Sequence, residues 1–104
     1  MDQVLKAILD AGDALAFAVQ EEMGLEDGRH TVKMAAVSRI MQSGDNPLTG
    51  KAHSFSSAEA MVTSDGEYAI YLGRVREAAG RRIRARAQYD ASVAHAKLAA
   101  AGAL

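Results

Sequence analysis

The chain has 104 residues, with 12 basic and 13 acidic side chains, no cysteine and a net charge of −1. This length predicts a single domain, and the balanced charge argues against both a globally basic nucleic-acid protein and a disordered polyelectrolyte. The absence of cysteine excludes disulfides and thiol catalysis.

Residues 2–43 are expected to form the first helical arm. Apolar residues recur at three- and four-residue spacing on one face of residues 2–23, and again over residues 30–43. Glycines frame the polar stretch 24–28 between these two segments. Two interpretations of this stretch are open: its first glycine ends a helix in a left-handed conformation, or it is a weak point inside one long helix. We favour a break or kink here.

The connection between the arms is expected to contain a loop and a short helix. A glycine and a proline of the kind that end helices predict a loop over residues 44–55. Ser56 and Glu59 then have the spacing of a capping box, which predicts a short helix over residues 57–63.

Residues 65–101 are expected to form the second arm, and Ser64 and Glu67 repeat the capping-box spacing at its start. A helix of this size is about 54 Å long, whereas a compact chain of this length has a radius of gyration of only about 13 Å. Its flank should therefore lie against another helix, another subunit or a nucleic acid. Apolar residues form a drifting stripe along it that resembles an imperfect coiled-coil seam: Tyr68, Leu72, Val75, Ala79, Ile83, Ala87, Ala94 and Leu98.

Alanine is the dominant apolar residue, with 22 copies. It favours helix strongly but buries little surface. The sequence therefore predicts an all-α, coiled-coil-like fold, in which two long arms pack as an antiparallel helical hairpin joined by the short helix. Because a thin core is commonly compensated by association, we expect a homodimer or higher oligomer.

Six arginines lie between residues 74 and 86, against a single acid. Arginine presents a planar set of donors that suits phosphates and carboxylates, so two interpretations are open. The arginines track the phosphates of a nucleic acid, or they pair with acids of the first half of the chain, where residues 1–52 carry a net charge of −3. The predicted partner-contact residues are five of these arginines and two residues of the loop: Arg74, Arg81, Arg82, Arg84, Arg86, Lys51 and His53.

Other site chemistry is not predicted. The three histidines lie on different segments, without the spacing of metal ligands. The acidic cluster at residues 21–27 has the pattern of a solvent-facing patch rather than of tuned catalytic carboxylates. We therefore expect no catalytic residues, no metal and no cofactor. No apolar run has the length of a membrane span or a secretory signal, so we expect a cytoplasmic protein.

Four short stretches carry a resemblance to a group of known proteins: NPLTGK at 46–51, HS at 53–54, SSAE at 56–59 and EYA at 67–69. Together with the tail rich in arginine and alanine, they resemble small, mostly helical bacteriophage and prophage proteins, often encoded among early or recombination genes. The resemblance covers about residues 44–98. It implies a phage context in a bacterial cytoplasm, with a host protein, a phage protein or a nucleic acid as the partner, and it brings no catalytic residues.

Two functions are therefore expected. The first is a non-enzymatic phage accessory protein that binds a macromolecular partner through the arginine-bearing helix and the loop. The alternative is a nucleic-acid-binding accessory factor of phage recombination or replication. Salt dependence separates the two, because phosphate binding weakens steeply as the salt concentration rises.

Overall fold

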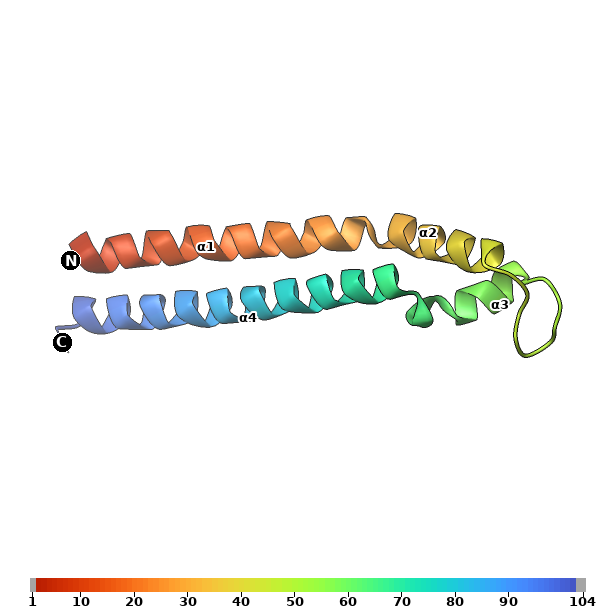
Figure 1. The fold of residues 1–104 in the computed structure, drawn as a ribbon. Coiled ribbons are helices and arrows are strands. Elements are labelled where there is room, and N and C mark those ends of the chain that lie inside the picture. The colour runs from red at the N-terminus through yellow and green to blue at the C-terminus, as the bar shows by residue number, and fades with distance from the viewer. Residues whose placement is uncertain (1, 103–104) are drawn as a thin grey trace. The chain divides into compact units, whose positions relative to one another are not determined.

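The computed structural model describes residues 2–102, and every regular element in that range is a helix (Figure 1). The elements are α1 (Asp2–Asp27), α2 (Arg29–Gln42), α3 (Phe55–Ala60), the single 3₁₀ turn η1 (Val62–Ser64) and α4 (Gly66–Ala100). The predicted all-α fold is confirmed. The short helix α3 lies in the connection between α2 and α4, as predicted.

The chain divides into two compact units. The first unit consists of residues 1–24 and 76–104, and the second of residues 25–75. The chain leaves the first unit within α1 and returns to it within α4. Each unit is described separately below.

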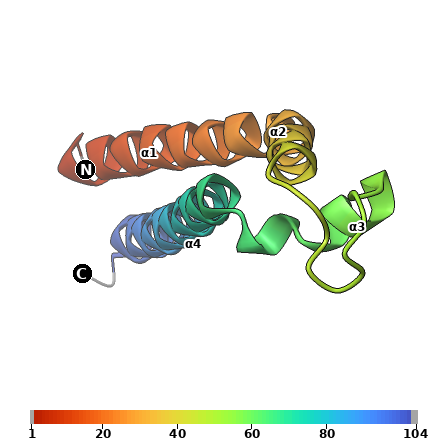
Figure 2. The same ribbon diagram turned by 45° about the vertical axis from the view of Figure 1, so that its right-hand side comes forward.

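The larger buried side chains gather in the second unit. They come from α2, α3, η1 and the start of α4, which close around one cluster: Ala36, Val37, Ala58, Val62, Tyr68, Tyr71 and Val75. The two tyrosine rings stack with their centroids 6.1 Å apart. Figure 2 shows η1 and α3 preceding α4, after the loop that leaves α2. The second unit therefore has a core of mixed aromatic, branched and alanine side chains.

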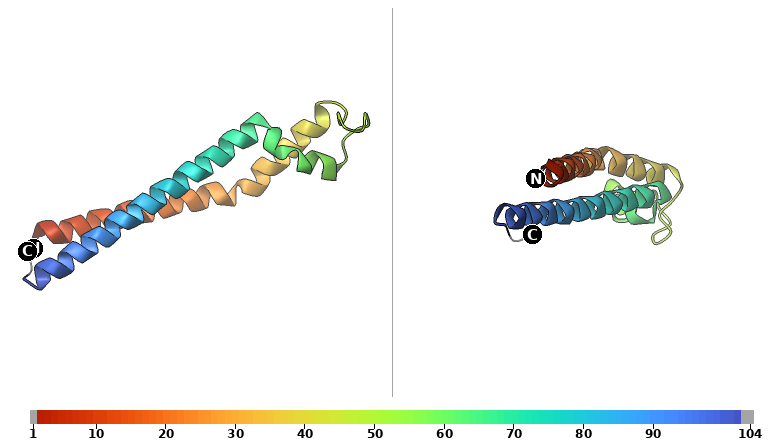
Figure 3. Two further views of the ribbon diagram at one scale, coloured as in Figure 1. Left: turned by 90° about the horizontal axis from the view of Figure 1, so that it is seen from below. Right: turned by 90° about the vertical axis from the view of Figure 1, so that its left-hand side faces the viewer.

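The first unit is an antiparallel pair of helical segments from α1 and α4, whose N- and C-terminal ends lie together (Figure 3). Its most buried side chains are small, and Ala11, Ala18 and Ala78 are the members with the least exposure. The ring of Tyr89 lies against Gly12, where an added Cβ would be 3.7 Å from the ring. This pair buries little apolar surface because alanine and glycine occupy its contact positions.

The predicted apolar stripe of α4 is correct only in its first half. Tyr68 and Val75 are buried, but Ile83 and Leu98 are exposed. Beyond Val75 the inward positions keep an alternating three- and four-residue spacing: Ala78, Arg82, Ala85 and Tyr89. The predicted stripe followed the largest apolar side chains in four-residue steps, so it drifted away from the face that contacts α1.

The first arm is interrupted at Gly28, the second of the two glycines in the predicted kink region. Gly28 has φ −84° and ψ −4°, and its N–H donates to the carbonyl of Leu25 at 3.2 Å. This is a three-residue spacing in place of the four-residue spacing of an α-helix. Gly24 lies inside α1 and does not have a positive φ, so the left-handed alternative for it is wrong.

The helix starts differ from the predicted capping boxes. The Ser54 hydroxyl accepts a hydrogen bond from the Ser57 N–H at 3.1 Å, so α3 begins two residues earlier than predicted. At α4 the side chain of Asp65, rather than that of Ser64, accepts the N–H of Tyr68 at 2.9 Å. Ser64 instead donates to the carbonyl of Met61 at 2.6 Å. Among the described residues, no helix combines the length and apolar character needed to cross a membrane.

Candidate functional site

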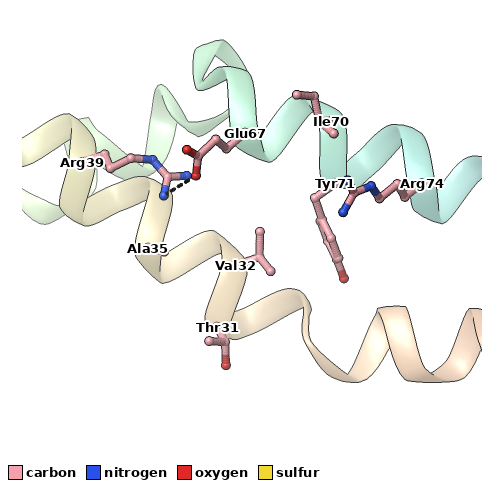
Figure 4. A pocket seen from close by; sticks show the side chains of 8 residues that line it. All are labelled: Thr31, Val32, Ala35, Arg39, Glu67, Ile70, Tyr71 and Arg74. Atoms are coloured by element: carbon pink, nitrogen blue, oxygen red, sulfur yellow. Dashed lines mark ion pairs between the residues drawn. The ribbon is translucent and has the colours of Figure 1, made fainter.

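A groove lies between α2 and α4 in the second unit. Its volume is about 470 Å³, which lies within the range of small-molecule and side-chain pockets. Each helix contributes four residues to its lining: Thr31, Val32, Ala35 and Arg39 from α2, and Glu67, Ile70, Tyr71 and Arg74 from α4. Figure 4 shows these side chains on the two facing helices.

The middle of the groove is apolar and is held in place by Tyr71. The Tyr71 ring is buried, and its hydroxyl donates to the backbone carbonyl of Leu25, next to the helix interruption. Burial raises the pKa of the Tyr71 hydroxyl above its ordinary value, so this group stays a donor. Ile70, by contrast, is 60% exposed. The groove therefore combines a fixed aromatic wall with an apolar side chain that has no cover.

One end of the groove is closed by an ion-pair network. The guanidinium of Arg39 donates to both carboxylate oxygens of Asp65, at 3.0 and 2.7 Å, and also lies 3.0 Å from a carboxylate oxygen of Glu67 (Figure 4). These bonds, together with the N–H of Tyr68, lower the pKa of Asp65 to about 2. The network joins α2 to the start of α4, because Asp65 is also the residue that caps α4.

The other end of the groove carries Arg74, which makes no ion pair with any of residues 2–102. Arg39 at the opposite end is already neutralised by two carboxylates. The groove is thus electrically asymmetric, with one cation paired to two carboxylates at one end, an apolar middle and one available positive charge at the other end.

The other predicted arginines belong to the first unit, and most of them are engaged there. Arg81 bonds Glu21 at 2.7 Å and Arg82 bonds Glu22 at 2.7 Å, both across the helix pair. Arg86 pairs along α4 with Asp90 at 3.3 Å. Only Arg84 among these four is without an ion pair in the described part of the chain. The arrangement matches the interhelical interpretation of the arginines and does not gather them on one surface.

The two predicted loop residues, Lys51 and His53, differ in their exposure. Lys51 is exposed beside Ala52, which bridges Asp45 across the loop. His53, predicted as a partner-contact residue, is only 9% exposed, with Nδ1 3.1 Å from the Ser57 hydroxyl. That hydroxyl donates to the carbonyl of Ser54, so the His53–Ser57 pair stabilises the start of α3 and is not arranged as a base and nucleophile.

The sequence analysis missed most of the groove. Arg39 and Asp65 are 26 residues apart, and no local spacing rule connects them. Tyr71 and Ile70 both fell outside the predicted stripe. Residues 2–102 contain no cluster of three or more metal-ligating side chains.

Comparison with known proteins adds no further assignment: a scan of protein-family models, a search of curated proteins and a search of solved structures each gave no match.

Proposed function

We propose that this protein is a non-enzymatic interaction protein that binds a segment of a partner protein in the groove between α2 and α4. The observation that carries the proposal is the combination of uncovered Ile70 with unpaired Arg74 in one concavity of about 470 Å³. An apolar side chain followed by a carboxylate would fill the middle of the groove and neutralise Arg74. The arginine-bearing helix α4 is thus the contact helix, with Arg74 as the contact charge.

The composition of the groove supports binding rather than a reaction. Its other charged groups, Arg39 and Glu67, are paired with each other, and its remaining lining consists of apolar side chains, Thr31 and Tyr71. Catalysis needs a nucleophile or an acid–base pair aimed at a common point. The groove offers instead a shape and one charge, which is what recognition of an amphipathic peptide segment requires.

The resemblance over residues 44–98 supports placing this activity in a phage setting. In that setting the protein acts in the bacterial cytoplasm, and its partner is a host or phage protein. The resemblance covers the connection and the first half of α4, which include Ile70 and Arg74 of the groove.

The nucleic-acid alternative has weaker support. Phosphate tracking needs several free cationic side chains along one face, yet Arg81, Arg82 and Arg86 are within 3.3 Å of carboxylates of the same chain. Arg74, Arg76 and Arg84 are left; Arg74 belongs to the second unit, and Arg76 and Arg84 belong to the first.

The test is selection of a random peptide library on the protein, followed by measurement of the enriched peptides by fluorescence anisotropy. We expect enriched peptides to carry an apolar residue close to Asp or Glu. Arg74→Glu should weaken their binding about tenfold or more, the scale of one lost charge-assisted hydrogen bond. Arg84→Glu is the matched control, because it makes the same charge change on the same helix outside the groove.

Two results would overturn the proposal: no enrichment, or equal losses for both variants. Labelled single- and double-stranded DNA is measured in parallel at about 50 and 200 mM salt. Binding of DNA that falls steeply between these concentrations, without any peptide binding, would replace the proposal with the nucleic-acid alternative.

A further inference from the structure

Segment α1 of the first unit carries a second apolar stripe, whose members Leu5, Leu9 and Met23 its own unit leaves exposed. Its residues follow each inward position by one and repeat with alternating four- and three-residue spacing: Leu5, Leu9, Gly12, Ala16, Val19 and Met23. Leu9 is 61% exposed, and Leu5 and Met23 are also exposed. A helix with two adjacent stripes of this kind has the pattern of a helix that packs against two neighbours.

The α4 segment of the first unit carries a matching outer stripe. Its apolar members are Ala79, Ile83 and Val93, each one residue after an inward position, and Ile83 is 58% exposed. Between Ile83 and Val93 the stripe carries Arg86 and Asp90, which are paired with each other at 3.3 Å. Burying such a pair costs less than burying a lone charge.

Both outer stripes lie on the same side of the helix pair. Successive residues of a helix turn by about 100°, so Leu5 and Ala7 lie on opposite sides of the α1 face that contacts α4. Ala7 lines a shallow groove with Ser92 and His95 of α4, which fixes that side of the pair. The outer stripe of α4 is turned to the other side, and so is Leu5. Together the two stripes form one continuous face, called here the outer face.

The ion pairs of the first unit fix the register between its two segments. Glu21 bonds Arg81, Glu22 bonds Arg82, and Gly12 lies against Tyr89. In each of these pairs the residue numbers sum to between 101 and 104. Each residue of the α1 segment therefore lies level with the α4 residue whose number, added to its own, gives between 101 and 104.

The outer face is complementary to itself in this register. A second copy, turned by half a turn about an axis parallel to the helices, would place its α4 on α1 without any shift along the axis. Leu9 would then meet Val93 of the second copy, and Val19 would meet Ile83 of the second copy. Met23 would meet Ala79 of the second copy.

Charge favours the same arrangement. The α1 part of the first unit, residues 2–24, has five acidic groups and one basic group, whereas the α4 part, residues 76–102, has six basic and two acidic groups. The half-turn lays each acidic segment on a basic one. Laying α1 on α1 of the second copy would instead bring like charges together, which is unfavourable.

We infer that the first unit binds a second copy of this chain through the outer face, forming an antiparallel four-helix bundle from two α1 and two α4 segments. This contact is built from residues of the first unit and does not depend on the groove of the second unit or on its proposed function.

The first experiment is sedimentation velocity at about 100 μM protein, comparing the parent chain with Leu9→Glu, Ile83→Glu and Phe17→Glu. The parent should sediment at twice the 11.0 kDa chain mass. The first two variants should be helical monomers, because each buries a charge in the outer face. Phe17→Glu is the control: Phe17 is 69% exposed on α1 but lies off the outer stripe, so this variant should stay dimeric.

The second experiment tests the arrangement and uses the absence of native cysteine. Leu9→Cys and Val93→Cys are prepared as separate variants and oxidised alone and mixed. Cross-linked dimers should form chiefly in the mixture, since a disulfide needs Cα atoms within about 7 Å. A monomeric parent chain, a Phe17→Glu monomer, or cross-linking of each variant only with itself would overturn the inference.

Discussion

At the scale of single residues, two glycines in the second unit differ in whether their backbone conformation accepts a residue with a Cβ. Gly28 has φ −84°, and an added Cβ would come no closer than 3.6 Å to the carbonyl oxygen of Leu25. Gly50 has φ +68°, a conformation that strains any residue with a Cβ. We predict that Gly28→Ala raises the free energy of unfolding by up to about 1 kcal/mol, and that Gly50→Ala lowers it by about 1–2 kcal/mol.

Urea unfolding followed by circular dichroism measures both glycine variants, and the identical chemical change makes each the control for the other. Gly28→Ala should also increase the helical signal slightly, because alanine favours helix at the interruption. Loss of stability in Gly28→Ala would contradict the assignment and show that the interruption itself is required, through the Tyr71 bond to Leu25.

Residue types alone did not place the charged site residues. The arginine stretch was recognised, and so was its acidic counterpart in the first half of the chain. Which arginine stays free depends on the register of two helices: Arg81 and Arg82 face Glu21 and Glu22, whereas Arg74 faces an open groove. That register is set by contacts about 60 residues apart, which no local pattern in one sequence reveals.

At the scale of elements, Asp65 joins α2 to α4. Its carboxylate accepts from Arg39 and from the N–H of Tyr68, so it is both an ion-pair partner and a helix cap. These bonds lower its pKa to about 2 in the folded state, whereas an unfolded aspartate titrates near 4. A lowered pKa means that the stabilisation is complete above about pH 4 and is lost as the pH falls toward 2.

We predict that Asp65→Asn flattens the fall in melting temperature between about pH 4 and 2, because asparagine still caps α4 but carries no charge to lose. Asp65→Ala should lower stability further at neutral pH, by about 1 kcal/mol for the lost cap. Thermal melts across pH 2–7 measure both effects, with exposed Asp10→Asn as the control carboxylate. If the melting temperature of Asp65→Asn fell between about pH 4 and 2 as steeply as that of the parent chain, the role of the ion pair would be refuted.

The helices themselves were predictable because their signals are local. Residues 65–101 contain neither proline nor a turn cluster, and α4 spans Gly66–Ala100. Caps and faces were less predictable. Several Ser and Asp residues compete at each start, and tertiary contacts select Ser54 and Asp65. The stripe of α4 was misjudged beyond Val75 because small side chains, not large ones, fill the contact between the segments of the first unit.

At the scale of the whole molecule, the two units differ in what holds them together. The second unit has a core in which Val37 is 2% exposed and two tyrosines stack. The first unit has alanine contacts, interhelical ion pairs and the uncovered outer face. Burial of apolar surface is the main favourable term in folding, so the second unit should be stable within one chain. The first unit should gain much of its stability from association with a second copy.

Hydrogen exchange measured by mass spectrometry tests this difference between the units. At about 1 μM protein, where we expect dissociation, amides of α2 and of residues 68–75 should exchange most slowly, and those of residues 2–24 much faster. Raising the concentration tenfold should slow exchange in residues 2–24 by up to about threefold, because the monomer fraction of a dimer falls at most with the square root of the concentration. Leu9→Glu should abolish this concentration dependence and leave α2 unchanged. Equal protection of both units at every concentration would mean that the alanine contacts suffice without a second copy.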